Sequence, residues 1–133
     1  MDFNKKYSVK DAVSYYIYVC NEMNIENEEI NLRNVLENLV LTMKNISKEE
    51  ILRNINKNEL RKIRFSWIFS SNEVIAYAIA IFYVLINRKE RLTERNIIHT
   101  MLSELYMHKP SKTLKESEFI AEKIFPELKE NKK

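Results

Sequence analysis

Apolar side chains recur at steps of three and four residues along most of the chain, which is the spacing of one face of an α-helix. This spacing predicts a helix over residues 8–23, and the same pattern predicts further helices over residues 28–44, 94–107 and 113–125. Short polar or charged stretches separate these segments. The chain is therefore expected to be built from helices joined by turns.

Several of these helices are predicted to begin at a capping box, in which a serine or threonine and a carboxylate three residues later satisfy free backbone N–H groups. The boxes are Ser8 with Asp11, Ser47 with Glu50 and Thr113 with Glu116. The Ser47 box precedes a short helix with few apolar residues. Thr93 is expected to cap the helix over residues 94–107.

The most hydrophobic segment runs from Val74 to Ile86, 13 residues without a charge. It is apolar on nearly every side, which is typical of a helix surrounded by others. A transmembrane helix needs about 18–20 residues, so no membrane span is predicted. We therefore expect a central helix over residues 73–87, with the other helices packed around it.

Residues 60–69 carry two conflicting patterns. Ile63, Trp67 and Phe69 fall on an alternation typical of a half-buried strand, whereas Leu60, Ile63 and Trp67 also share a helical face. No second convincing strand is present to pair with this segment, so a helix is predicted. The resulting expectation is an all-α fold, a single domain over residues 1–133 with six or seven helices and a frayed tail at 127–133.

Composition narrows the classes of function. The 133 residues include no glycine and only 2 prolines. Without glycine the chain cannot form a P-loop, a dinucleotide-binding turn, a nucleophile elbow or an EF-hand loop. All-β folds, whose tight hairpins draw heavily on glycine, are also disfavoured.

Candidate catalytic and metal-binding residues are few. Cys20 lies on the apolar stripe of its helix and is expected to be a buried hydrophobe, with no second cysteine for a disulfide. His99 and His108 fall on opposite faces of one helix and cannot share a metal. No enzyme activity, metal or cofactor is predicted. The free cysteine and the absence of a signal-peptide pattern favour a reducing cytoplasm.

Positive charge gathers in two segments on either side of the central helix. Residues 44–64 carry a net charge of +4 and residues 88–112 a net charge of +3. If the two segments met on one face, they would form a surface for nucleic-acid phosphates. The candidate residues are Lys57, Arg61, Lys62, Arg64, Arg88, Lys89, Arg91 and Arg95. Ordinary solvated helix faces are the alternative interpretation.

Three tyrosines near the N-terminus lie off the main apolar stripe: Tyr7, Tyr15 and Tyr18. Tyrosine is enriched at protein interfaces because it joins apolar area to a polar tip. These residues are candidates for a partner-binding surface or a homodimer seam. Packing into the core is the equally weighted alternative.

Residues 7–22 (YSVKDAVSYYIYVCNE) and 30–40 (INLRNVLENLV) resemble the opening of Panacea-type antitoxin domains over about a quarter of the chain. The glycine–proline signature that follows in such domains is absent, so no residue roles are taken from this resemblance. The function predicted is a non-enzymatic adaptor, inhibitor, or immunity or antitoxin protein that binds a protein partner through a helical surface. A nucleic-acid-binding regulator is the alternative.

Overall fold

The computed structural model describes residues 5–23, 32–55, 60–64, 66–107 and 115. Most of them are helical, which confirms the all-α expectation at that level. In chain order the elements are β1 (Tyr7–Ser8), α1 (Val9–Glu22), α2 (Leu32–Asn45), α3 (Lys48–Arg53), the 3-10 helix η1 (Leu60–Lys62), β2 (Ile68–Phe69), α4 (Ser71–Asn87) and α5 (Glu94–Met107). The helix expected over 113–125 and the tail at 127–133 lie outside the described residues.

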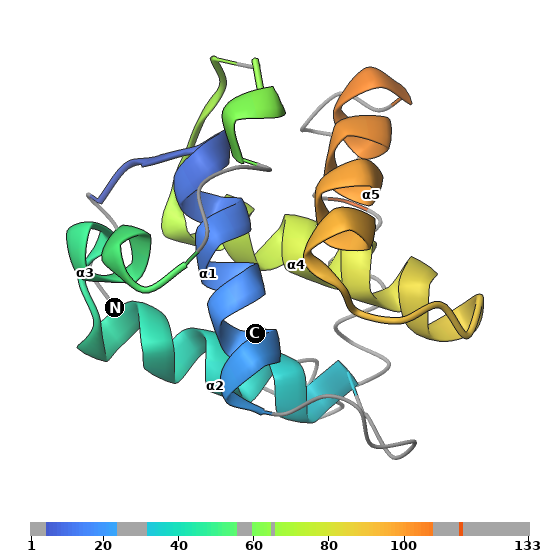
Figure 1. Ribbon diagram of the computed structural model, residues 1–133, viewed down its shortest axis with the longest axis horizontal. Helices are drawn as coiled ribbons and strands as arrows, with labels where there is room; N and C mark the ends of the chain where they lie inside the picture. Colours follow the sequence, from blue (N-terminus) through green and yellow to red (C-terminus); the bar gives the residue numbers. More distant parts are fainter. Residues whose placement is uncertain (1–4, 24–31, 56–59, 65, 108–114, 116–133) are drawn as a thin grey trace, which may run out of the picture.

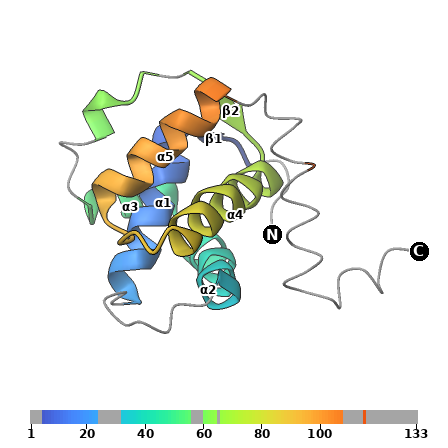
Figure 2. The same cartoon turned by 90° about the vertical axis from the view of Figure 1, so that its right-hand side faces the viewer.

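The helices cross in two layers. In Figure 1, α1 and α5 stand upright and contact one another, while α4 passes behind them. Helix α2 lies across the lower end and contacts both α1 and α4, and α3 packs on the side of α1 away from α5. Figure 2, turned by 90°, separates the front layer of α1 and α5 from α4. The buried side chains of all five helices meet between these layers.

Local capping signals locate the helix starts. At α1, Ser8 N donates to the Asp11 carboxylate at 2.9 Å and Asp11 N donates to Ser8 Oγ at 3.1 Å, which confirms the predicted box. Ser70 and Glu73 form the same reciprocal pair at α4. Helix α4 therefore begins at Ser71, two residues before the predicted start. The side-chain oxygens of Ser47 and Thr93 cap α3 and α5.

The segment 60–69 differs from the predicted helix. Leu60–Lys62 forms only a 3-10 turn, and Ile68–Phe69 forms β2. Strand β2 pairs antiparallel with β1, with Tyr7 opposite Phe69 and Ser8 opposite Ile68. The helix prediction was wrong because the partner strand is two residues long and has no periodicity of its own.

Helix α4 is buried along most of its length. Its buried side chains include Tyr77, Phe82 and Leu85, each of which is 0% exposed. Tyr83, by contrast, is 42% exposed. The near-continuous hydrophobic run thus reflects burial on several sides. Among the described residues, no helix combines the length and hydrophobicity needed to cross a bilayer.

Candidate functional site

Two of the three tyrosines expected at an interface are in the core. Tyr7 is 1% exposed and Tyr15 is 0% exposed. Their rings pack edge to face with centroids 5.8 Å apart, and Tyr15 Oη donates to the carbonyl oxygen of Ile46 at 2.6 Å. The interface expectation is therefore wrong for Tyr7 and Tyr15, and the alternative of core packing is confirmed for them. Tyr18 is half-buried.

Tyr16, another buried tyrosine of α1, anchors this helix to α4. The Tyr16 hydroxyl donates to the carbonyl oxygen of Val74 in the first turn of α4, and its ring packs edge to face on Phe82. A buried hydroxyl must find such a partner, because an unpaired one loses its hydrogen bonds to water. Tyr16 therefore joins α1 to α4.

Lys48 fastens the N-terminal strand to α3. Its Nζ donates to the carbonyl oxygen of Lys6 at 2.8 Å, lies 4.0 Å from the Asp11 carboxylate, and sits 5.7 Å from the ring centroid of Tyr7. Lys6 directly precedes β1, Tyr7 lies in β1 and Asp11 belongs to the cap of α1, so each contact is to a residue with a structural role. We interpret this group as a structural clamp.

Burial suppresses ionisation of the reactive groups of α1. Loss of solvent raises the pKa of the Cys20 thiol from its ordinary value of 9.0 to about 12. Burial likewise raises the pKa of Tyr15 and that of Tyr16 well above the usual range. Cys20 is only 5% exposed, which confirms the expected buried position. The raised pKa keeps its thiol protonated at neutral pH and disfavours a nucleophilic role.

The described residues contain no group of three or more histidine, cysteine, aspartate or glutamate side chains placed to hold a metal ion. His99 is exposed on α5. His108 lies outside the described residues, as does Lys57 of the first basic segment.

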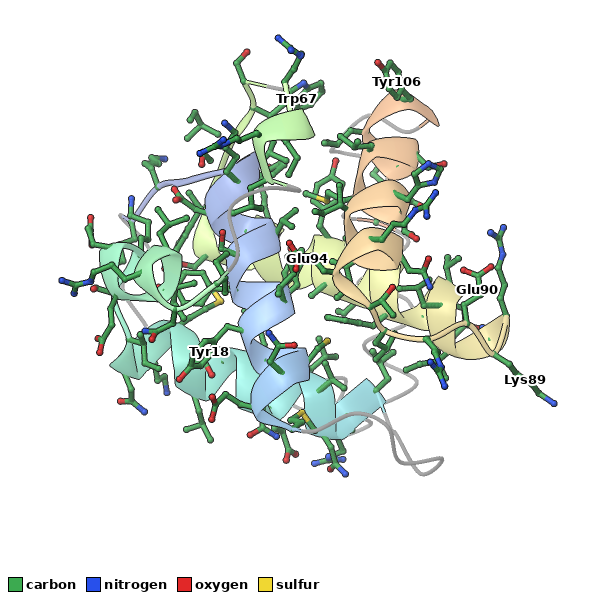
Figure 3. The ribbon with its side chains drawn as sticks, in the orientation of Figure 1. Tyr18, Trp67, Lys89, Glu90, Glu94 and Tyr106 are labelled. Atoms are coloured by element: carbon green, nitrogen blue, oxygen red, sulfur yellow. The ribbon has the colours of Figure 1, made fainter. Side chains whose placement is uncertain are left out.

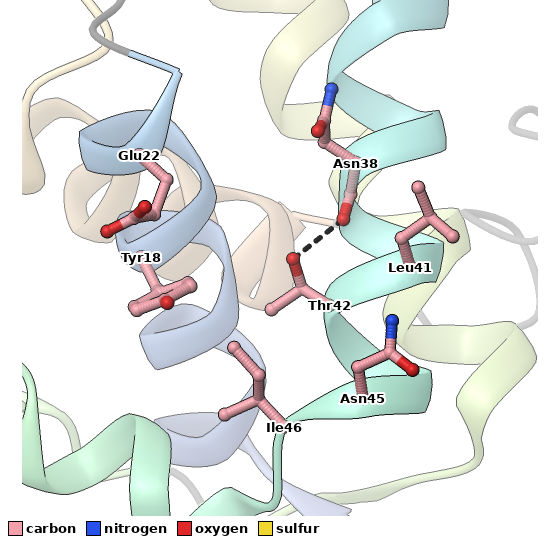
Figure 4. Close-up of a pocket in the computed structure, with 7 residues that line it drawn as sticks. All are labelled: Tyr18, Glu22, Asn38, Leu41, Thr42, Asn45 and Ile46. Atoms are coloured by element: carbon pink, nitrogen blue, oxygen red, sulfur yellow. Dashed lines mark hydrogen bonds between the residues drawn. The ribbon is translucent and has the colours of Figure 1, made fainter.

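An open groove runs between α1 and the second half of α2 (Figure 4). Its volume is about 240 Å³. It is lined by Tyr18, Glu22, Asn38, Leu41, Thr42, Asn45 and Ile46. Leu41 is 55% exposed, and Thr42 Oγ1 turns back to donate to the Asn38 carbonyl at 2.7 Å. We call this feature the α1–α2 groove.

The two basic segments are not brought together. Arg61 and Arg64 are exposed, Lys62 belongs to η1, and this segment leads into β2 at the N-terminal end of α4. The second segment begins where α4 ends, and its basic residues Arg88, Lys89, Arg91 and Arg95 are all exposed. The 17 residues of α4 span about 25 Å at roughly 1.5 Å per residue. Figures 1 and 2 both separate η1 from the turn between α4 and α5.

The turn after α4 explains part of the second basic segment. Lys89 has a positive φ of 56°, the left-handed conformation that usually falls to glycine. Glu90 N donates to the Leu85 carbonyl at 3.0 Å and Lys89 N donates to the Ile86 carbonyl at 3.1 Å, which is the hydrogen-bond pattern of a Schellman motif. Basic residues here also lie beside the negative end of the helix dipole.

A second surface lies at the opposite end of the molecule from the α1–α2 groove. Trp67, Ile68 and Tyr106 are 37%, 60% and 80% exposed. Figure 3 draws Trp67 and Tyr106 at the same end, and Figure 2 shows the end of α5 beside β2. We call Trp67, Ile68 and Tyr106, with the neighbouring Arg61 and Arg64, the aromatic end face. In the sequence Trp67 follows Arg64 by three residues, whereas Tyr106 is distant in the chain and nothing in the pattern places it at this surface.

Comparison of the chain with family models, with curated proteins and with solved structures finds no match in any of the three. The resemblance of residues 7–22 and 30–40 to antitoxin domains accordingly has no support from a family match. The groove and the aromatic end face are interpreted from their own residues.

Proposed function

We propose that the chain, as one helical domain, is a non-enzymatic interaction protein of the reducing cytoplasm that binds a protein partner in the α1–α2 groove. The observation that carries this proposal is Leu41, an aliphatic side chain 55% exposed in an open groove between two helices. Leaving such a side chain in water has no structural benefit. Covering it with a partner's apolar side chain would be favourable.

The composition of the groove supports a protein as the ligand. Tyr18, Leu41 and Ile46 supply apolar area, and Tyr18 and Ile46 already pack partly on the core. Glu22 and Asn45 are exposed and offer hydrogen-bonding groups in the same lining. Protein interfaces commonly combine apolar side chains with hydrogen-bonding groups in this way. A helix or loop that presents an apolar side chain is the expected partner element.

The other interpretations of the sequence fit this arrangement less well. Nucleic-acid binding across both basic segments loses support because those segments lie near opposite ends of α4. A second copy of the chain is the alternative occupant of the groove, and it is distinguished by the molecular mass of the free protein in solution.

The test is affinity capture from lysate of the source organism with nuclease present, using the wild-type chain and Leu41→Asp. A charged side chain in the groove should reduce capture of a specific partner at least 10-fold, because burying an unpaired carboxylate is costly. Direct titration of the captured partner then checks the same ratio with purified proteins.

Ile68→Asp is the matched control, since Ile68 is a similarly exposed aliphatic residue, 60% against 55%, on another surface. The proposal predicts that Ile68→Asp binds the partner as the wild type does. Equal binding by Leu41→Asp and the wild type would overturn it. Loss of binding in Ile68→Asp alone would move the protein interface to the aromatic end face.

A further inference from the structure

We infer that the aromatic end face binds single-stranded nucleic acid. This site is separate from the α1–α2 groove, and the inference goes beyond the proposed protein interaction. The proposed site uses Arg61 and Arg64 of the first basic segment, together with the aromatic side chains at the same end of the molecule. The second basic segment, residues 88–112, takes no part in it.

Two aromatic side chains are exposed at this end of the molecule. Trp67 lies just before β2 and is 37% exposed, while Tyr106 lies in the last turn of α5 and is 80% exposed. The chain brings these two residues, 39 positions apart, to one end of the molecule (Figures 2 and 3). Neither exposure is explained by core packing, and exposed rings are the surfaces on which unpaired bases stack.

Positive charge accompanies the rings. Arg61 and Arg64 are exposed, and neither forms an ion pair with another described residue. Lys10 is exposed in the first turn of α1, two residues after Ser8, which pairs with Ile68 in the sheet. These three cations belong to the segments around η1 and the start of α1, which lie at the same end of the molecule as Trp67 and Tyr106 (Figures 1 and 3). Together with the rings they offer groups for both the phosphates and the bases of a strand.

Two acidic side chains close in sequence to this surface, Asp11 and Glu104, do not add an exposed negative charge to it. The Asp11 carboxylate accepts from Ser8 N in the cap of α1. Glu104 stands two residues before Tyr106, about 200° further round α5, and is half-buried. Within the part of the chain that the structure describes, the exposed charges assigned to the aromatic end face are those of Arg61 and Arg64, and they are positive.

The chemistry favours a single strand over the two other anionic partners. Duplex bases are already stacked on one another, so they are not free to stack on Trp67 and Tyr106. An anionic membrane is usually bound by an amphipathic helix with a broad apolar face. Here Ile68 is the one aliphatic member of the surface, which also contains two aromatic and two basic residues.

Trp67 makes the test direct because it is the only tryptophan in the chain. Stacking of a base on its indole should quench the emission when a 12-nucleotide oligothymidylate is titrated into the full-length protein. With three cations each contributing about 0.7 to the slope for single strands, log K should fall with log salt at a slope near −2. That slope corresponds to an affinity about 20-fold lower at 200 mM than at 50 mM salt.

Variants separate stacking from charge. Tyr106→Ala should weaken binding roughly 10- to 100-fold, the range expected for one lost base stack. The double variant Arg61→Ala/Arg64→Ala should reduce the salt slope by about 1.4. Tyr83→Ala and the double variant Arg88→Ala/Arg91→Ala are the matched controls, on exposed residues elsewhere, and should bind as the wild type does. Tyr106 is 80% exposed, so its truncation leaves the fold intact, which circular dichroism checks.

Several results would overturn the inference. These are no quenching by oligothymidylate, equal or tighter binding to a hairpin duplex, or binding confined to vesicles with 30% anionic phospholipid. Equal losses in Arg88→Ala/Arg91→Ala and Arg61→Ala/Arg64→Ala would also overturn it, since the charge would then act without a defined site. Leu41→Asp should leave oligonucleotide binding unchanged, so the failure of one proposal does not decide the other.

Discussion

Tyr15 and Tyr16 in α1 contrast with Trp67 and Tyr106 at the aromatic end face. Both tyrosines of α1 are 0% exposed, whereas Trp67 and Tyr106 are 37% and 80% exposed. The buried hydroxyls each reach a backbone carbonyl, Ile46 for Tyr15 and Val74 for Tyr16. These bonds join α1 to residues 31 and 58 positions away in the chain.

The difference teaches that the residue type does not decide whether an aromatic side chain serves the core or a ligand. A tyrosine can be buried where its hydroxyl finds an acceptor, because the hydrogen bond replaces those lost to water. A ring that keeps most of its area in solvent contributes little to the stability of the fold. Substitutions of Tyr15 and Tyr16 should therefore lower the free energy of unfolding, whereas substitutions of Trp67 and Tyr106 should lower the affinity for a ligand.

The largest expected contrast is between Tyr16→Ala and Tyr106→Ala. Truncating the fully buried ring should reduce the free energy of unfolding by about 3–5 kcal/mol, as for other core aromatics. Truncating the exposed ring should change it by no more than about 0.5 kcal/mol. Urea unfolding measures both. Comparable losses in the two variants would show that Tyr106 packs on the fold and would break the comparison.

Alkaline pH should lower the stability of the fold through the buried acidic groups of α1, Cys20, Tyr15 and Tyr16. The folded protein keeps the proton of Cys20 up to a pKa of about 12, whereas the unfolded chain releases it above about 9. Above about pH 9 the unfolded state binds fewer protons, so the contribution of Cys20 to the free energy of unfolding is constant below pH 9 and falls as the pH rises from about 9 to 12. Tyr15 and Tyr16 act in the same direction above pH 10.

Cys20→Ala tests this assignment, because it removes one of the buried acids. Between pH 9 and 12 its free energy of unfolding should fall less steeply than that of the wild type, by about 1.4 kcal/mol per pH unit at most. Urea unfolding at a series of pH values gives both slopes. Parallel slopes would mean that the thiol ionises in the folded protein as readily as in the unfolded chain.

A smaller change should come from Tyr15→Phe, which keeps the ring and removes the hydroxyl. Loss of the bond to the Ile46 carbonyl should cost about 1 kcal/mol, measured by urea unfolding. Tyr83→Phe makes the same chemical change at a side chain 42% exposed and should be neutral. If the two variants lose equal stability, the hydroxyl of Tyr15 is not an anchor.

The smallest expected effect is a gain in stability. Lys89→Gly relieves the left-handed backbone at φ 56° and should raise the free energy of unfolding by roughly 0.5–1 kcal/mol. Arg88→Gly, at the neighbouring residue with φ −83°, should lower it, because glycine there adds only flexibility. Thermal unfolding of the two variants should shift in opposite directions.

Features encoded by neighbouring residues were predictable from the sequence. The start of α1 and the capping of α3 and α5 follow from Ser8, Ser47 and Thr93, since a cap is formed within four residues. The burial of Cys20 follows from its place on the stripe of α1. The three- and four-residue spacing likewise identified α2 and α5 to within a few residues, and the continuous hydrophobic run identified α4.

Features that depend on distant residues were not predictable. Nothing near Tyr15 indicates that its hydroxyl reaches Ile46, so its burial could only be weighed as an alternative. Strand β2 needs Tyr7 and Ser8, about 60 positions earlier, and two residues carry no pattern. The separation of the two basic segments depends on the direction of α4, and the approach of Tyr106 to Trp67 depends on the direction of α5.

The bond from Tyr16 to Val74 also has a consequence for how the protein is made. A ribosome adds about 5–20 residues per second, so the acceptor emerges roughly 3–12 s after its donor. During that interval α1 can pack on α2 and α3 but not on α4, so the side of α1 that carries Tyr16 stays uncovered and open to chaperones. A nascent chain stalled before residue 74 leaves the Tyr16 hydroxyl without its acceptor.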